Sequence, residues 1–162
     1  MQSRPLARLP LPPPRSGAYA ISVPPSAAYV IRPFAEATDG AFVYSSWLRS
    51  GLRHRPACLS RSTYFREQHR VITALMRAAL ETRLMAVAAD DPEQVFGWLF
   101  GGAPPAHRLD YVYVKPIYRR LGVARALLSA FGPVQVYTHA GELLLPDAEY
   151  NPYLLYNLPP LP

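Results

Sequence analysis

The spacing of apolar residues changes sharply in the second half of the chain, and that change marks its most informative stretch. Leu109–Val114 is rich in β-branched and aromatic residues, which predicts a strand covered on both faces. From Val123 to Phe131 the apolar residues recur with the period of a helix. Gly132 and Pro133 follow in the order that ends helices. We therefore expect a buried strand, a short turn and a helix here.

The same criteria predict the other elements. Strands are expected at Tyr29–Pro33, Arg83–Ala89, Val95–Gly101 and Val134–His139. Helices are expected at Ala41–Arg49, after a cap at Thr38 or Asp39, and from Ser62 or Thr63 to about Glu81. The turn at 90–93 should join the second and third strands as a hairpin. Together these elements predict an α/β (α+β) fold.

The composition fits one globular domain with proline-rich ends. The chain has 162 residues, 50% of them apolar, which is enough for one core. Its 19 prolines cluster at both ends. Residues 1–26 are therefore expected to form an extended or disordered arm, residues 27–158 a single domain and residues 159–162 a tail.

The net charge of +6 comes almost entirely from arginine, since Lys115 is the only lysine. Arginines dominate the segment 49–83, whereas 142–149 is acidic. A positively charged protein attracts anions, nucleic acid among them, at low specificity. A solvated basic helix face explains the same pattern at least equally well.

Few residues suggest metal, redox or membrane chemistry. Cys58 is the only cysteine, so no internal disulfide can form and a reducing cytoplasm is the simplest compartment, the host cytoplasm if the protein is viral. It has no obvious His partner, which favours a packing residue over a nucleophile. His69 lies on the apolar stripe of the second helix with no second ligand at metal spacing, so we predict no metal site. No segment is long and apolar enough to cross a membrane.

The junction between the central strand and its helix has the features of an anion site. The first turn of a helix offers backbone N–H groups without internal partners, and the macrodipole adds positive charge there. Arg119 and Arg120 offer forked donors to phosphate oxygens. Gly122 lets a ligand approach the backbone, and Ala124 keeps the next turn small.

These residues resemble a known signature. Arg119-x-x-Gly122-x-Ala124, preceded by Val114-Lys-Pro116, is similar to the acyl-CoA-binding motif of the GCN5-related N-acetyltransferases (GNAT). The resemblance implies a mostly antiparallel twisted sheet flanked by helices, with acetyl-CoA as cofactor. It implies that the turn holds the pyrophosphate and the strand the pantetheine arm, through Tyr113, Val114, Arg119, Arg120, Leu121, Gly122, Val123 and Ala124. A strand, turn and helix without any ligand stays open as the alternative.

The resemblance covers roughly 29–139. The opening strand, Ile31–Ala35 followed by Asp39, is similar to the family's opening strand, and the strand containing Gly97 is similar to the family's Ile-x-Gly strand. Glu149–Tyr156 echoes the family's late helix with Asn and Tyr, but Pro152 interrupts it. We therefore expect a shortened or atypical C-terminal part, as in small acetyltransferase-like proteins of tailed bacteriophages.

The family's roles suggest candidates for the remaining chemistry. Acceptor contacts would come from the first helix, at Tyr44, Ser46 and Trp47; the favoured alternative is that Trp47 belongs to the core and the serines lie at the surface. In this family the strand Val134–His139 would separate from the central strand and open a cleft between them. Candidates for the general base are Asp110 and His139, because each lies on or at the end of a strand bordering that cleft. The acid would be one of Tyr150, Tyr153 and Tyr156, each of which could instead be a packing or surface residue.

Two classes of function follow. The first is an acetyl-CoA-dependent N-acyltransferase acting on an amine acceptor, which could be a small molecule, a protein amine or a nucleobase. The second is a non-catalytic binding or assembly protein that keeps the fold and docks a partner through its proline-rich ends. A homodimer is compatible with either class.

Overall fold

The computed structural model of the chain describes residues 28–78, 81–102, 107–139, 145 and 147–157. The expected arm at 1–26 and tail at 159–162 lie outside these residues and stay predictions. The strands are β1 (Tyr29–Pro33), β2 (Glu81–Ala88), β3 (Val95–Gly102), β4 (Arg108–Val114), β5 (Val136–Tyr137) and β6 (Glu149–Tyr150). The α-helices are α1 (Glu36–Gly51), α2 (Arg61–Arg77) and α3 (Val123–Phe131), and the 3-10 helices are η1 (Leu52–His54), η2 (Pro116–Tyr118) and η3 (Pro152–Asn157).

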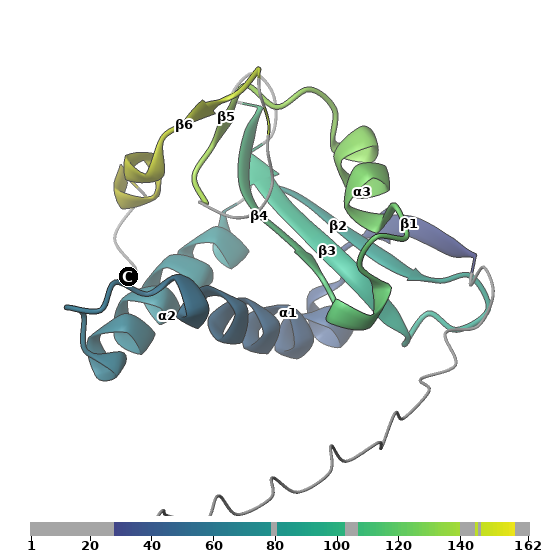
Figure 1. Ribbon diagram of the computed structural model, residues 1–162. Coiled ribbons are helices and arrows are strands. Elements are labelled where there is room, and N and C mark those ends of the chain that lie inside the picture. Colours follow the sequence, from purple (N-terminus) through teal and green to yellow (C-terminus); the bar gives the residue numbers. More distant parts are fainter. Residues whose placement is uncertain (1–27, 79–80, 103–106, 140–144, 146, 158–162) are drawn as a thin grey trace, which may run out of the picture.

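The described strands form one six-stranded sheet in which the order across the sheet is the order along the chain. Strands β1 to β4 pair antiparallel, including the expected hairpin of β2 and β3, whereas β5 and β6 pair parallel. Helices α1 and α2 lie on one face of the sheet and α3 lies on the other (Figure 1). The expected mixed, mostly antiparallel sheet with flanking helices is therefore confirmed.

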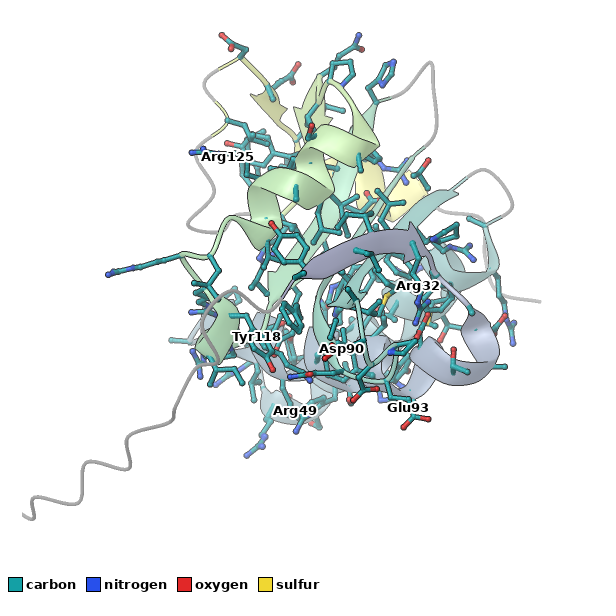
Figure 2. The ribbon with its side chains drawn as sticks, turned by 90° about the vertical axis from the view of Figure 1, so that its right-hand side faces the viewer. Arg32, Arg49, Asp90, Glu93, Tyr118 and Arg125 are labelled. Atoms are coloured by element: carbon teal, nitrogen blue, oxygen red, sulfur yellow. The ribbon has the colours of Figure 1, made fainter. Side chains whose placement is uncertain are left out.

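Several expected boundaries were wrong at the helix ends. Helix α1 begins at Glu36, and neither Thr38 nor Asp39 is its cap. The Asp39 carboxylate instead accepts two hydrogen bonds from the Arg32 guanidinium on β1, at 2.7 and 2.8 Å, and one from the Ala35 backbone N–H at 2.8 Å. This ion pair ties the start of α1 to β1, near the labelled Arg32 in Figure 2.

Helix α2 begins and ends earlier than expected. Its cap is Ser60, whose hydroxyl accepts a hydrogen bond from the Thr63 N–H at 3.1 Å. It ends at Arg77 because Ala78 is already extended, with φ −64° and ψ 124°. The Arg83 guanidinium then donates to the Ala78 carbonyl at 2.6 Å, which satisfies an acceptor at the helix end.

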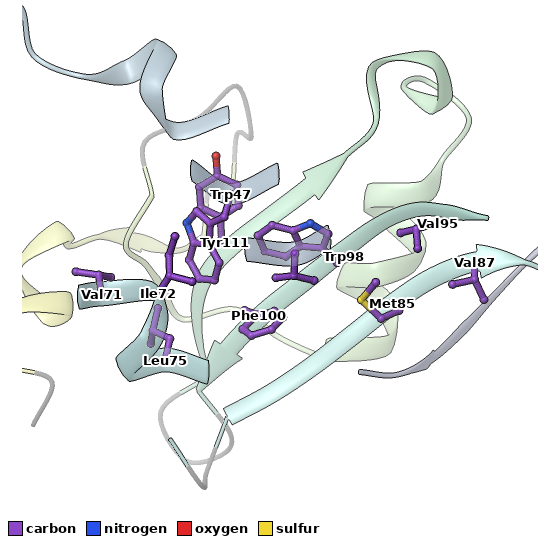
Figure 3. Close-up of a cluster of buried hydrophobic side chains, with 11 residues drawn as sticks. Trp47, Val71, Ile72, Leu75, Met85, Val87, Val95, Trp98, Phe100 and Tyr111 are labelled. Atoms are coloured by element: carbon purple, nitrogen blue, oxygen red, sulfur yellow. The ribbon is translucent and has the colours of Figure 1, made fainter. Parts of the chain in front are cut away.

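Two hydrophobic cores lie on opposite faces of the sheet. The first packs α1 and α2 against the sheet and centres on Trp47, Trp98, Phe100 and Tyr111, whose rings contact one another with centroids 5.0 to 5.5 Å apart (Figure 3). The second packs α3 against the other face through residues that include Phe96, Leu99, Leu109, Tyr118, Val123 and Leu127. The sheet is thus buried on both sides, as the apolar strand patterns predict.

A β-bulge in β4 decides which residues reach which core. Phe100 pairs with Tyr111, but the next residue, Gly101, pairs with Leu109, so Asp110 is an extra residue on β4. Leu109 consequently belongs to the α3 core, whereas Tyr111, two residues later, belongs to the core beneath α1 and α2. A regular strand would have placed both side chains on the same face.

The C-terminal part is short among the described residues, as expected. The strand predicted at Val134–His139 is reduced to the two residues of β5, and β6 is equally short. Residues 152–157 form a 3-10 helix where the resemblance implied an α-helix. Among the described residues no helix has the length and apolar character needed to span a bilayer. Cys58 is exposed, which corrects its interpretation as a packing residue.

Candidate functional site

A groove of about 1190 Å³ runs along one edge of β4, between α1 and the start of α3. It exists because β4 and β5 separate. Their pairing covers only Arg108 with Val136 and Leu109 with Tyr137, and a last backbone bond joins the Thr138 N–H to the Leu109 carbonyl at 3.0 Å. Beyond Leu109, no described strand pairs with this edge of β4, so the two strands diverge and the groove opens between them.

The backbone of β4 presents polar groups to the groove. The Lys115 N–H donates to the Phe96 carbonyl of β3 at 2.9 Å. Because backbone groups alternate in direction along a strand, those of Val112 and Val114 face the groove instead. The Arg119 Nε, which also lines the groove, donates to the Val114 carbonyl at 3.4 Å. The backbone N–H groups of Val112 and Val114 are therefore the strand donors that face the groove.

The start of α3 closes one end of the groove with backbone N–H groups that have no partner inside the helix. Gly122 is the cap residue with φ +80° and ψ 0°, and no side chain of the described residues caps the helix. Arg120 also has a positive φ, at 66°, so the turn between η2 and α3 is sharply folded. Gly122, Val123 and Ala124 line the groove here. The macrodipole of α3 adds positive potential at this end.

The charges around this end are all positive. Lys115, Arg119, Arg120 and Arg125 line the groove, and among the described residues no carboxylate lines it or forms an ion pair with these four. The Lys115 ammonium lies over the Phe42 ring of α1, 4.8 Å from its centroid. Burial lowers the pKa of Lys115 below its usual value. This combination suits an anion with several oxygens, such as a diphosphate.

Tyr111 forms the centre of the other end of the groove. Its hydroxyl lies 2.8 Å from the Ser50 hydroxyl of α1, and its ring contacts the His139 ring with centroids 4.0 Å apart. All three residues line the groove. Burial raises the pKa of Tyr111, and the Ser50 hydrogen bond only partly opposes this, so the phenol stays protonated at neutral pH.

The structure brings most of the predicted cofactor residues together. Those lining the groove are Tyr113, Val114, Arg119, Arg120, Gly122, Val123 and Ala124, together with His139 and Ser46. Leu121 does not line it and is 49% exposed. Ser46 lines the groove, but its hydroxyl is already hydrogen-bonded within the protein. It accepts a hydrogen bond from Trp98 Nε1 at 2.9 Å and donates one to the Val43 carbonyl at 3.0 Å.

Other predicted residues lie elsewhere. Asp110 does not line the groove, because its buried carboxylate accepts hydrogen bonds from Arg108 at 2.6 and 2.8 Å and lies 3.4 Å from the Thr138 hydroxyl. This placement argues against Asp110 as a base that faces the acceptor. Trp47 is 3% exposed in the first core, which agrees with the alternative interpretation of Trp47 as a core residue. Tyr44 contacts His69 of α2, whose Nδ1 is hydrogen-bonded to the Tyr44 hydroxyl.

The C-terminal tyrosines do not join the groove either. Tyr150 lies on β6, 45% exposed, with its ring against Tyr137, and Tyr153 is 74% exposed. Neither lines the groove. The side chain of Tyr156 lies outside what the structure describes, so its candidacy stays a prediction. The short β6 and η3 lead this segment away from β4 (Figure 1).

Sequence patterns missed several groove residues. Ser50, Tyr111 and Tyr118 appear in the sequence as ordinary helix, strand and turn residues. Arg49 and Arg53 appear as a basic helix face. Only Lys115, as the single lysine beside the motif, offered a usable signal.

Comparisons with known proteins bear on the fold. No protein-family model matches the chain, and no curated protein matches it in sequence. A Pyrococcus furiosus structure, provisionally assigned as an acetyl transferase, aligns with a TM-score of 0.57 and 12% identity over 80% of this chain and 89% of its own. The sheet order, the helix layers and this alignment define the fold as that of the GCN5-related N-acetyltransferases.

Two further structures are more distant. The apo form of YjaB from Escherichia coli aligns with a TM-score of 0.47 and 22% identity over 64% of each chain, so the match spans less than two thirds of that protein. The PaiA N-acetyltransferase from Thermoplasma acidophilum, solved with coenzyme A, aligns with a TM-score of 0.43 and 18% identity over 64% of this chain and 69% of its own.

Proposed function

We propose that this protein is an acetyl-CoA-dependent N-acyltransferase that acts on an amine. The observation that carries the proposal is the groove along β4, which opens where β4 and β5 separate and ends at the uncapped, positively charged start of α3. The fold supports it, since this sheet is the one that acyl-CoA-binding proteins of the family use.

The residues present fit coenzyme A. The N–H groups that begin α3 and the guanidinium groups of Arg119 and Arg120 would hold its diphosphate. Val112 and Val114, with backbone groups directed into the groove, would hold the pantetheine arm as an added strand. When bound, acetyl-CoA supplies a thioester carbonyl, at which a carbon–nitrogen bond to the amine forms as the carbon–sulfur bond breaks.

The side chains at the Tyr111 end of the groove would carry out the proton transfers of this reaction. The His139 imidazole would accept the proton that the amine gives up, and the Tyr111 hydroxyl would donate one to the departing sulfur; both residues line the groove and their rings are in contact. Water between the two side chains would return the proton from His139 to Tyr111, so that the amine proton ends on the thiol. A backbone N–H of β4 would face the oxyanion.

Calorimetric titration tests the proposal by comparing coenzyme A with pantetheine, which lacks the diphosphate and the adenosine 3′-phosphate attached to it. We expect coenzyme A to bind about 100-fold tighter, since two charge-assisted hydrogen bonds at α3 suffice for that difference. An Arg119→Ala/Arg120→Ala variant should remove most of the difference. Equal affinities for both compounds, or no binding of coenzyme A at millimolar concentration, would favour a non-catalytic binding protein instead.

A second measurement addresses turnover. Acetyl-CoA consumption is followed with a panel of small amines, peptides and single-stranded DNA, which covers the three acceptor classes. Coenzyme A binding without consumption across the panel would leave the fold as a binding module.

A further inference from the structure

Two arginines stand at the Tyr111 end of the groove, where the acceptor amine would enter. Arg49 lies in the last turn of α1 and Arg53 lies one helical turn later, in η1. Both line the groove. Ser50, next to Arg49 in the chain, contacts the Tyr111 hydroxyl at 2.8 Å, which fixes this part of the chain beside Tyr111.

Nothing in the described part of the groove neutralises these two charges. No carboxylate lines the groove there, and neither arginine forms an ion pair among the described residues. Arg49 is nevertheless oriented, because its Nε donates to the Ser45 carbonyl at 3.1 Å and its Nη2 donates to the Ser45 hydroxyl at 3.3 Å. An oriented guanidinium without a carboxylate partner is ready to receive an anionic oxygen.

The two arginines are separate from those that would serve the coenzyme. Arg119, Arg120 and Arg125 surround the start of α3, whereas Arg49 belongs to α1 on the opposite side of the sheet. Figure 2 shows Arg49 and Arg125 well apart. The coenzyme's diphosphate therefore has its own donors.

Three of the arginines that follow in the chain do not extend this charge. Arg66 and Arg70 form ion pairs with Glu67 at 3.0 and 3.4 Å. Arg83 turns inward, with Nη2 donating to the carbonyls of Leu75 and Ala78. A polynucleotide needs a row of cations along its backbone, so the arrangement favours a compact anion over a nucleic acid strand.

We propose that the acceptor is a small amine that also carries an anionic group, a phosphate or a carboxylate, held by Arg49 and Arg53 while the amine faces Tyr111 and His139. This inference rests on the proposed function and names its substrate class. Two consequences follow from the charge. Polyamines are repelled, and the cationic surroundings favour the neutral, nucleophilic form of the bound amine.

This acceptor class is tested by measuring how tightly amines bind to the intact protein, with and without saturating coenzyme A. The measurement does not require turnover. The probes are O-phosphoethanolamine, β-alanine, ethanolamine and putrescine, with affinities measured by calorimetry or by NMR titration. We expect at least one of the two anionic amines to bind about tenfold tighter than ethanolamine, and putrescine to bind most weakly. The comparison of O-phosphoethanolamine with β-alanine tells whether phosphate or carboxylate is the preferred anion.

Two arginine variants test whether Arg49 and Arg53 form the anion site. Arg49→Ala and Arg53→Ala should each weaken binding of the preferred anionic amine about tenfold and leave coenzyme A affinity unchanged. Arg77→Ala is the matched control, since Arg77 is exposed at the end of α2 and does not line the groove. It should change neither affinity.

The outcomes separate this inference from the proposed function. Ethanolamine or putrescine binding as tightly as the anionic amines would overturn the acceptor class, and so would tighter binding of a single-stranded oligonucleotide than of either. A loss of coenzyme A affinity in the Arg49 and Arg53 variants would assign these arginines to the coenzyme and overturn it as well. Arginine-dependent binding of an anionic amine by a protein that does not bind coenzyme A would support the anion site while refuting the proposed function.

Discussion

Replacing Gly122 with valine should abolish most coenzyme A binding while leaving the protein folded. Gly122 has φ +80° and ψ 0°, in the left-handed region, and it caps α3 at the end of the groove. An added Cβ would meet only the Tyr29 hydroxyl, at 3.7 Å, which is an ordinary contact. At the Cβ the cost to the fold is therefore backbone strain and not a clash.

The expected loss of stability and the expected loss of coenzyme A affinity differ in size. A branched residue in this region costs about 1–2 kcal/mol, partly offset by about 0.4–1 kcal/mol from the reduced freedom of the unfolded chain. A domain stability of about 5–15 kcal/mol absorbs this. A side chain at position 122 would stand where the diphosphate must approach the first amides of α3. Losing one charge-assisted hydrogen bond there costs about 1.5–3 kcal/mol, a decrease in affinity of roughly 10- to 100-fold.

Gly132→Val provides the control at the other end of the same helix. Gly132 has φ +101° and ψ −165°, a region that only glycine occupies readily, and nothing lies within 4 Å of an added Cβ. It should cost about 1–3 kcal/mol of stability without touching the groove. The assay is urea unfolding for stability and calorimetry for coenzyme A affinity. Unchanged affinity in Gly122→Val, or an equal loss in Gly132→Val, would refute the placement of the diphosphate at α3.

Further substitutions probe the groove and the fold. Tyr111→Phe should lower kcat about 100-fold while coenzyme A affinity stays within about twofold. Because burial raises the pKa of Tyr111 above its usual value, any loss of wild-type rate from ionisation of this phenol should begin at a higher pH than for an ordinary tyrosine. His139→Ala should reduce kcat more than coenzyme A affinity, and equal rates in both proteins would remove it as the base. Acetic anhydride should modify Lys115 readily near neutral pH, because burial lowers its pKa, and saturating coenzyme A should protect it, as peptide mass spectrometry would reveal. Burial opposes the low pKa of Asp39, but its hydrogen bonds with Arg32 and the Ala35 N–H outweigh burial and hold that pKa below 3.8. Asp39→Asn should therefore cost about 1–3 kcal/mol at pH 7, a difference that is present above pH 3.8 and is lost as the pH falls below it.

The central strand, turn and helix were predictable because their local signals agree. The expected helix at Val123–Phe131 has the bounds of α3, since an uninterrupted apolar stripe meets a glycine and a proline at its end. The hairpin of β2 and β3 was equally clear from its turn residues. In both cases neighbouring residues determine the structure, so no distant contact could overrule the pattern.

Distant contacts decided what the sequence could not predict. The bulge at Asp110 has no local signal, yet it sends Tyr111 to the side of α1, where it meets Ser50 and His139. Similarly, Asp39 has the composition of a helix cap, but the guanidinium of Arg32 on an adjacent strand holds it. The tyrosines near the C-terminus were assigned a role by resemblance, and for Tyr150 and Tyr153 the short β6 and η3 lead away from the groove.

The sequential strand order has a consequence for synthesis. Every residue of the core beneath α1 and α2 precedes position 114, so that core can close while later segments are still inside the ribosome. The opposite core needs Tyr118, Val123 and Leu127, and until α3 has emerged the sheet exposes Phe96 and Leu99 on an uncovered apolar face. The nascent chain is therefore most vulnerable to aggregation, and most in need of a chaperone, in the interval between the completion of β4 and the docking of α3.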